Sequence, residues 1–134
     1  MGSAQLRRFA VSVSGGWQEV LLHSGFDPRQ RSFGDLSGLS GQTPKDVFQN
    51  LLRDISRLWS HGSSLAFAYS AAPFFEKCVC YEPLEMELLL SDCGFLVYAH
   101  SDADELARQY FRESGTAQPV LIPPGLCCLL AVRQ

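Results

Sequence analysis

The chain has 134 residues, of which 46% are hydrophobic and 19% are charged, and its formal net charge is −3. These proportions are typical of a folded domain with a substantial core and exclude a disordered chain. The 11 Lys and Arg residues are scattered, so direct nucleic-acid binding is not expected. No apolar run approaches the roughly 20 residues that span a bilayer, so no membrane contact is expected and the composition favours an intracellular protein.

Two short strands are predicted near the amino terminus. Phe9, Val11 and Val13 alternate with smaller residues, which is the two-residue period of a half-buried strand. Gly15 and Gly16 favour a turn after this run, and residues 17–23 are expected to form a second short strand.

Residues 27–42 are predicted to form a long flexible loop within a single domain that covers residues 1–134. The segment is rich in Gly, Ser and Pro, and a loop of this length is often functional. Phe33, Leu36 and Leu39 are its isolated apolar residues. They either fold back onto the domain or form a docking segment for a partner protein.

The first helix is the clearest predicted element. Thr43 suits the N-cap, Pro44 suits the first helical position, and Asp46 lies in the first turn. Apolar residues at helical spacing then form one stripe. Its members are Val47, Phe48, Leu51, Leu52, Ile55, Leu58 and Trp59. Such a stripe favours a core-facing helix that ends near Gly62.

Alternating patterns predict several strands in the second half of the chain. Residues 65–69, 74–81 and 94–100 are expected to be strands. Residues 84–90 also alternate, with Glu85 and Glu87 on the polar side, although a short helix is possible there. Ser101 is predicted to cap a second helix with Ala103, Leu106, Ala107, Tyr110 and Phe111 on its buried face, ending at Gly115.

The last predicted strand is the apolar run 126–132, which follows Pro123, Pro124 and Gly125 after a short extended piece at 120–122. A run this short and apolar favours a strand that is covered on both faces. The order of elements predicts an α+β fold: a split βαβ, ferredoxin-like variant with a mostly antiparallel sheet, two helices on one face and extra strands. The other face then needs a cover, and a second copy of the chain is the expected one. Its contact residues would be Leu126, Cys128, Leu130 and Val132.

The five cysteines are expected to be reduced and structural. Cys78 and Cys80 would share one face of a strand, whereas Cys127 and Cys128 would face opposite ways. A zinc site with His23, His61 or His100 is conceivable, but the sequence has no C-x2-C pair with a matching second pair. No metal is therefore expected.

Catalytic motifs are weak throughout. His100 followed by Asp102 and Asp104 would suit acid–base chemistry, but a strand that runs into a charged, capped helix explains the same pattern. Neither a phosphate-binding loop nor a nucleophile elbow is present. The sequence therefore predicts a protein that is not an enzyme, with no catalytic residue and no cofactor.

Four blocks of the sequence resemble the adenovirus early region 4 open-reading-frame-three (11-kilodalton) protein family. Residues 8–27 resemble its amino-terminal strands, and residues 51–59 followed by 74–77 resemble its first helix and the next segment. Residues 94–102 resemble the strand before its second helix, and residues 127–132 resemble its penultimate strand. The blocks occur in the family's order and cover about half of the chain.

The resemblance implies a non-enzymatic viral early regulatory protein of the host nucleus. Such proteins form a homodimer and then polymerise by exchanging a carboxy-terminal tail. The assembly binds host antiviral and DNA-damage factors, including promyelocytic leukaemia and tripartite-motif proteins. Residues 28–42 and 78–93 are longer here than in the family, Pro124 replaces a polar residue that assists assembly, and the exchanged tail is missing after Gln134. A divergent homologue or paralogue that forms a small closed oligomer is therefore expected. The alternative is a ferredoxin-like dimer with a small-molecule-binding or hydrolytic site. Exposed apolar residues in segment 27–42 would favour protein docking, whereas apolar residues folded over a polar pocket would favour the ligand site.

Overall fold

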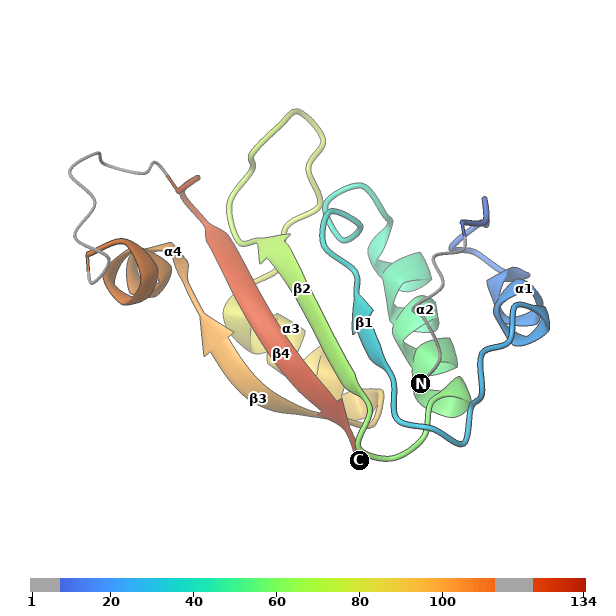
Figure 1. Cartoon of the computed structure of the whole chain (residues 1–134). Coiled ribbons are helices and arrows are strands. Elements are labelled where there is room, and N and C mark those ends of the chain that lie inside the picture. Colours follow the sequence, from blue (N-terminus) through green and yellow to red (C-terminus); the bar gives the residue numbers. More distant parts are fainter. Residues whose placement is uncertain (1–7, 113–121) are drawn as a thin grey trace.

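A four-stranded mixed sheet organises the chain (Figure 1). The computed structural model describes residues 8–112 and 122–134, except the side chains of residues 110–112. The strands are β1 (Phe33–Asp35), β2 (Ser64–Ser70), β3 (Phe95–Ser101) and β4 (Leu126–Arg133). The helices are α1 (Trp17–His23), α2 (Lys45–Leu58), α3 (Pro83–Asp92) and α4 (Ala103–Leu106), which continues as the π-helix Ala107–Arg112.

The strand order is β1-β2-β4-β3. β1 pairs with β2 in parallel, and β4 pairs antiparallel with β2 on one side and with β3 on the other. β1, β2 and β3 therefore all run in one direction, and their carboxyl ends meet at the same edge of the sheet. The first residue of β4 lies at that edge as well.

The predicted first helix is confirmed as α2. Its apolar stripe is the reason that it folds onto the sheet, since Phe48, Leu51, Leu52 and Ile55 are all buried. Burial of each such side chain contributes roughly 1.5–3 kcal/mol to folding. The helix begins one residue later than expected: Pro44 is the N-cap, and no side chain caps the helix. Thr43 is instead buried.

The predicted strands 65–69, 94–100 and 126–132 are confirmed as β2, β3 and β4. Alternate residues of β4 (Cys127, Leu129 and Ala131) are buried against the two helices. In β2 the same face carries Leu65, Phe67 and Tyr69. Together with Phe95 of β3 and the buried residues of α2 and α3, these side chains form one core.

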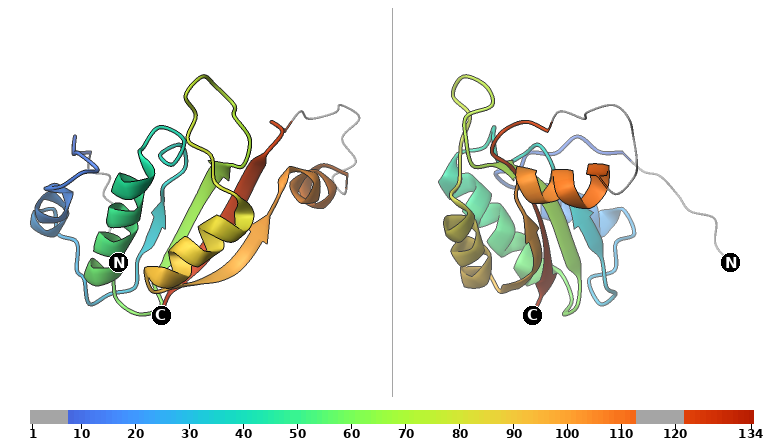
Figure 2. Two further views of the ribbon diagram at one scale, coloured as in Figure 1. Left: turned by 180° about the vertical axis from the view of Figure 1, so that it is seen from behind. Right: turned by 90° about the vertical axis from the view of Figure 1, so that its left-hand side faces the viewer.

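α2 and α3 lie on the same face of the sheet, and none of the described helices spreads across the other face (Figure 2). We call this second surface the open face. Leu126, Cys128, Leu130 and Val132 of β4 lie on it and are only partly buried. Its neighbours Phe33, Leu96 and Tyr98 are 68%, 54% and 72% exposed. The register places Phe33, Ser64, Val132 and Leu96 in one row across the four strands.

The two strands predicted before residue 24 are wrong. Residues 17–23 form α1, and residues 9–14 contain only an isolated bridge at Ser12. Trp17, Val20 and Leu21 are spaced as on one helical face, a signal that the adjacent glycines obscured. Trp17 and Val13 pack against the core.

The strands predicted at 74–81 and 84–90 are also wrong, and the short-helix alternative for the second is confirmed as α3. Glu82 and Glu85 form a capping box, and Pro83 occupies the first helical position. Met86 and Leu90, four residues apart, are buried, whereas Leu84 and Leu88 are exposed. Residues 71–82 form turns and irregular chain between β2 and α3.

The start of the second predicted helix is shifted by one residue. Asp102, not Ser101, is the N-cap of α4, and its carboxylate accepts a hydrogen bond of 2.9 Å from the Glu105 N–H. The predicted buried side chains of Tyr110 and Phe111, the helix end at Gly115 and most of the extended piece at 120–122 fall outside the described parts of the chain.

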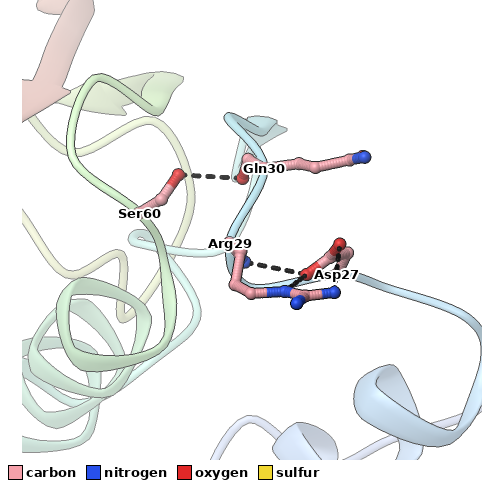
Figure 3. Close-up of polar contacts among 4 residues, drawn as sticks. All are labelled: Asp27, Arg29, Gln30 and Ser60. Atoms are coloured by element: carbon pink, nitrogen blue, oxygen red, sulfur yellow. Dashed lines mark hydrogen bonds and ion pairs between the residues drawn. The ribbon is translucent and has the colours of Figure 1, made fainter.

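The segment predicted as a long flexible loop, residues 27–42, contains β1 and is tied to the rest of the fold. The Ser60 hydroxyl donates a hydrogen bond of 2.8 Å to the Gln30 carbonyl, and Arg29 pairs with Asp27 at 3.1 Å beside it (Figure 3). The Ser32 N–H donates to Ser63 Oγ at 2.9 Å. These contacts, and the parallel pairing of β1, explain why a segment rich in glycine and serine forms the edge of the sheet.

The fold is therefore of the α/β type with a mixed sheet. Two helices on one face and a majority of antiparallel pairings were expected and are confirmed. The ferredoxin-like order of elements is wrong, because α2 joins the adjacent parallel strands β1 and β2. The expected split βαβ unit is present: α3 connects β2 to β3, which run in the same direction, and β4 is inserted antiparallel between them. Within residues 8–112 and 122–134, no helix is both long enough and apolar enough to cross a membrane.

We expect Gly125→Ala to destabilise the fold more than Gly38→Ala. Both glycines have a positive φ, of 82° and 85°, which costs alanine about 1 kcal/mol. At Gly125 the added Cβ would also lie 2.6 Å from Ala72 Cβ and 2.7 Å from the Ala72 backbone nitrogen, whereas at Gly38 it meets nothing within 4 Å. Urea unfolding should show a loss of about 3 kcal/mol for Gly125→Ala and about 1 kcal/mol for the control. Equal losses would contradict the packing of β4 against residue 72.

Candidate functional site

A pocket of about 310 Å³ lies at the carboxyl ends of β1 and β2. One wall is the turn after β1, another is the last part of β2, and a third comes from the segment that follows β2. The lining residues are Gly38, Ser40, Gly41, Gln42, Ala68, Tyr69, Ser70, Phe74, Phe75 and Leu126. Open α/β sheets bind ligands outside the carboxyl ends of their strands, so the position of this pocket is the first reason to consider it functional.

The turn after β1 is held in place by hydrogen bonds to β2. The Leu36 N–H donates to the Ala66 carbonyl at 3.0 Å, and the Ala68 N–H donates to Ser37 Oγ at 3.4 Å. Asp35 in turn accepts a hydrogen bond of 2.9 Å from the Ser37 N–H. The Ser37 hydroxyl and then the Ser37 N–H lower the pKa of Asp35, so this carboxylate is ionised near neutral pH.

Ser40 is the most deeply buried polar residue of the pocket wall. Its residue exposure is 1%, and its Oγ has no hydrogen-bond partner among the described residues. A buried hydroxyl without a partner costs roughly 1–3 kcal/mol.

The opposite wall carries two aromatic rings on a turn that the fold holds firmly. Phe74 and Phe75 are 65% and 44% exposed. The Val79 N–H donates to the Gly41 carbonyl at 3.0 Å, which ties this segment to the turn after β1. At Gly41 a Cβ would lie 3.5 Å from both the Phe75 ring and Cys78 Sγ. The pocket therefore combines apolar rings with a few hydroxyl and amide groups.

A second polar cluster lies nearby on the core side of the sheet. His100 Nδ1 is 2.8 Å from Glu87 Oε1, and His100 Nε2 shares a short hydrogen bond with the Tyr69 hydroxyl. The His100 side chain is only 13% exposed. The cluster joins β3, α3 and β2 across the intervening β4. Because Tyr69 is only 2% exposed, we interpret Glu87, His100 and Tyr69 as a structural contact and call them the polar clamp.

Burial controls the ionisation of the two core tyrosines. Desolvation is the main cause that raises the pKa of Tyr69 far above its ordinary value, and the neighbouring Cys127 and Glu87 add to it. Desolvation, with a smaller effect of Glu85, raises the pKa of Tyr81 to about 12. Neither hydroxyl is therefore an available base near neutral pH.

The acid–base grouping considered from the sequence is not assembled. His100 pairs with Glu87 and Tyr69, whereas Asp102 caps α4. Glu85 belongs to the capping box of α3 and forms an ion pair of 2.8 Å with Lys45. The alternation of β2 placed Tyr69 on the core face, but its contact with His100 depends on a strand order that the sequence does not reveal.

The predicted docking residues separate in the structure. Phe33 is exposed on the open face, whereas Leu36 and Leu39 pack against the core. The predicted self-association residues Leu126, Cys128, Leu130 and Val132 share the open face with Phe33. The pocket residues Ser40, Phe74 and Phe75 were not singled out from the sequence, and only the adjacent phenylalanines in a turn-rich segment signal them.

The described residues do not gather a metal site. No group of three or more His, Cys, Asp or Glu side chains lies within reach of one ion in the described parts of the chain. Cys93 and Cys127 are buried, and burial raises the pKa of both thiols. The pocket has a volume of about 310 Å³, and no Asp, Glu, His, Lys or Cys is among its lining residues.

No protein-family model matches the chain, and no protein of curated function matches it. Solved structures do match in fold. A putative methyltransferase from Thermobifida fusca YX aligns with a TM-score of 0.63 and 16% identity, over 94% of this chain and 53% of that one. The magnesium protoporphyrin IX methyltransferase of Synechocystis PCC 6803 with bound SAH aligns with a TM-score of 0.52 and 11% identity, over 87% and 55%. The pyocyanin biosynthetic protein PhzM aligns with a TM-score of 0.51 and 15% identity, over 87% and 38%.

At these identities the likeness shows the fold alone, which resembles the Rossmann-like fold of methyltransferases. The chain spans between 38% and 55% of the length of these three structures.

We expect Tyr81→Phe to protect the fold at alkaline pH. The folded-state pKa of about 12 lies above the ordinary value of 10.0, so the stability that neutral Tyr81 gives is complete below pH 10 and is lost as pH rises toward 12. Phenylalanine removes this loss, which amounts to about 2 kcal/mol between those pH values. It also removes a buried hydroxyl that has no partner among the described residues, so stability at pH 7 should not fall.

The matched control for this measurement is Tyr98→Phe, since the Tyr98 side chain is 72% exposed. Urea unfolding at pH 7 and at pH 11 reports both variants. A Tyr81→Phe protein that loses as much stability on alkalinisation as the wild type would show that Tyr81 ionises freely in the fold.

Proposed function

We propose that this chain supplies the acceptor-binding half of a methyltransferase-type α/β domain. In this proposal a small, largely apolar molecule occupies the pocket between the turn after β1, the end of β2 and the Phe74–Phe75 wall. The observation that carries the proposal is the position of that pocket at the carboxyl edge of a sheet whose fold matches methyltransferases.

The properties of the pocket support a small ligand with an aromatic or aliphatic body. Its volume of about 310 Å³ lies at the lower end of the range for small-molecule sites. Phe74 and Phe75 offer apolar faces, and the lining residues Gln42 and Ser70 supply polar side chains that would orient the molecule. This combination is typical of ligand sites, which are mostly apolar with a few placed polar groups.

The described residues do not fit the adenosyl cofactor that the Synechocystis structure contains. A nucleotide-type cofactor is usually held by a glycine-rich turn that lets the backbone approach it closely. The turn between β1 and α2 has only Gly38 and Gly41. These two glycines do not form the G-x-G-x-x-G pattern of such a turn. We therefore assign no methyl-transfer step to these residues. In this proposal the chain alone binds a ligand and is not an enzyme.

Ligand-detected NMR with a panel of phenols and aromatic carboxylic acids tests the acceptor site. We expect binding to the wild type and about tenfold weaker binding to Phe75→Ala, because the variant removes one apolar wall. Leu84→Ala is the control, since Leu84 is an exposed apolar residue of α3 outside the pocket lining. Absence of any aromatic ligand, or equal binding by the two variants, would contradict the assignment. Stoichiometric binding of S-adenosylhomocysteine by the chain alone would show that it is the cofactor-binding half instead.

A second function is favoured by the open face: a non-enzymatic, self-associating adaptor. Under this proposal the chain forms a homodimer and, as the resemblance to the adenoviral family implies, acts in the host nucleus on promyelocytic leukaemia and tripartite-motif proteins. Three large side chains there, Phe33, Leu96 and Tyr98, are more than half exposed, and the strip Leu126, Cys128, Leu130 and Val132 lies between them. Asp35 carries the one charge among the described open-face positions of the strands. A sheet face with this many exposed or partly exposed apolar side chains suits the packing of a second sheet.

Sedimentation of the wild type and of Leu130→Glu tests self-association. We expect a dimer of the wild type at micromolar concentration and a monomer of the variant, because a buried, unpaired carboxylate at the centre of the interface costs several kcal/mol. Leu88→Glu, at a 57% exposed position of α3, should leave the dimer intact. A wild-type protein that stays monomeric would refute the adaptor function while leaving the ligand pocket unaffected.

A further inference from the structure

Two thiols of the segment between β2 and α3 lie side by side next to the pocket. Cys78 and Cys80 are separated by one residue, and each is only partly buried. Both thiols lie along the same short stretch of backbone: Cys80 Sγ is 3.6 Å from the Cys78 carbonyl oxygen, and Cys78 Sγ is 3.8 Å from the Val79 carbonyl oxygen. We propose that Cys78 is an oxidation site and that Cys80 is its resolving thiol, so that hydroperoxides convert the pair into a reversible Cys78–Cys80 disulfide.

The surroundings of the two thiols give them different roles. The Phe74 N–H, and then hydrogen bonds from Cys80, Ser70 and the Phe75 N–H, lower the pKa of Cys78. Desolvation and the neighbouring Cys78 raise the pKa of Cys80. Cys78 therefore supplies the thiolate that attacks first. An accessible thiolate beside a second cysteine is the usual arrangement of a redox-sensitive site.

The chemistry proceeds in two balanced steps. The Cys78 thiolate attacks one oxygen of hydrogen peroxide, the O–O bond breaks, and the leaving hydroxide takes a proton to become water. Cys78 is then a sulfenic acid. The Cys80 sulfur attacks the Cys78 sulfur, the S–O bond breaks, and the departing hydroxyl leaves as water with the Cys80 proton. The dithiol has lost two electrons and two protons in total, and the peroxide has been reduced to two waters.

The backbone around the pair explains why this disulfide would be reversible. Lys77 has a φ of 64°, a left-handed conformation that is uncommon outside glycine, and the Val79 N–H between the cysteines is held by the Gly41 carbonyl at 3.0 Å. Joining residues so close in sequence requires the chain between them to turn. The disulfide then competes with the Val79–Gly41 hydrogen bond, and a strained disulfide is more easily reduced.

The same geometry links oxidation to the pocket. A Cβ built at Gly41 would lie 3.5 Å from both Cys78 Sγ and the Phe75 ring, and Gly41 and Phe75 both line the pocket. Loss of the Val79–Gly41 contact would shift the aromatic wall relative to the turn after β1. This inference does not depend on the identity of the ligand or on methyl transfer.

The other described cysteines lack these features. Cys93 and Cys127 are buried, and Cys128 is partly buried on the open face. Desolvation raises the pKa of all three. Selectivity for Cys78 over Cys128, which is also partly buried, is therefore the distinguishing prediction.

Mass spectrometry after brief treatment with hydrogen peroxide tests the proposal. At neutral pH we expect alkylation of Cys78 at least about tenfold faster than that of Cys128, because thiolate fraction controls the rate. Peroxide should give a product lighter by two hydrogens, which a reducing agent restores. Cys80→Ser should instead accumulate a sulfenic acid at Cys78 that dimedone traps, and Cys78→Ser should lose the disulfide altogether. Cys128→Ser is the control and should behave as the wild type.

Hydrogen exchange supplies an independent readout. The Val79 amide should exchange faster in the oxidised protein than in the reduced protein, and reduction should reverse the change. The proposal is overturned if Cys78 and Cys128 react at equal rates, if Cys80→Ser still yields an intramolecular disulfide of Cys78, or if peroxide takes Cys78 directly to the sulfinic acid. An oxidised protein with unchanged Val79 exchange would overturn the link to the pocket.

Discussion

The insertion of β4 between β2 and β3 is the constraint on which the rest of the structure depends. Seven residue pairs join β4 to β2, and the pairs with β3 run along almost its whole length. β4 is the strand that pairs with β3, so β3 joins the sheet ladder only through β4 among the described strands. The alternation of β4 then fixes the two sides of the molecule: Cys127, Leu129 and Ala131 enter the core, and Cys128 and Leu130 face outward. The polar clamp of Glu87, His100 and Tyr69 also forms across β4, because it requires β2 and β3 at that spacing.

This arrangement gives the molecule two surfaces with different physical characters. The carboxyl edge holds a pocket with hydroxyl, amide and aromatic groups, and it is built from turns that hydrogen bonds hold to the strands. The open face carries Leu126, Cys128, Leu130 and Val132 of β4 beside the exposed side chains of Phe33, Leu96 and Tyr98. The first surface suits a small molecule, and the second suits another sheet or helix. The proposed ligand binding depends on the first surface, and the proposed self-association depends on the second.

Much of the secondary structure could be predicted from the sequence, and the failures have identifiable causes. The apolar stripe of α2 and the alternation of β2 and β4 were sufficient to predict these three elements, because each element buries one continuous face. Residues 84–90 alternate as a strand would, yet the capping box at Glu82 and the neighbouring Pro83 decide for a helix. β1 has only three residues, and its parallel pairing with β2 cannot be seen locally. The open-face residues of β4 followed from alternation alone. The pocket did not, since it depends on which strand ends are neighbours.

The adjacent cysteines of β4 provide the most direct test of the central claim that this strand divides a core side from an open side. Cys127 is 2% exposed, whereas Cys128 is partly exposed on the open face. Native-state alkylation followed by peptide mass spectrometry measures the two rates separately. If β4 divides the core side from the open side, Cys128 is modified in the folded protein, whereas Cys127 reacts only when the protein unfolds. Equal rates, or faster modification of Cys127, would contradict the register of β4 and the two surfaces that follow from it.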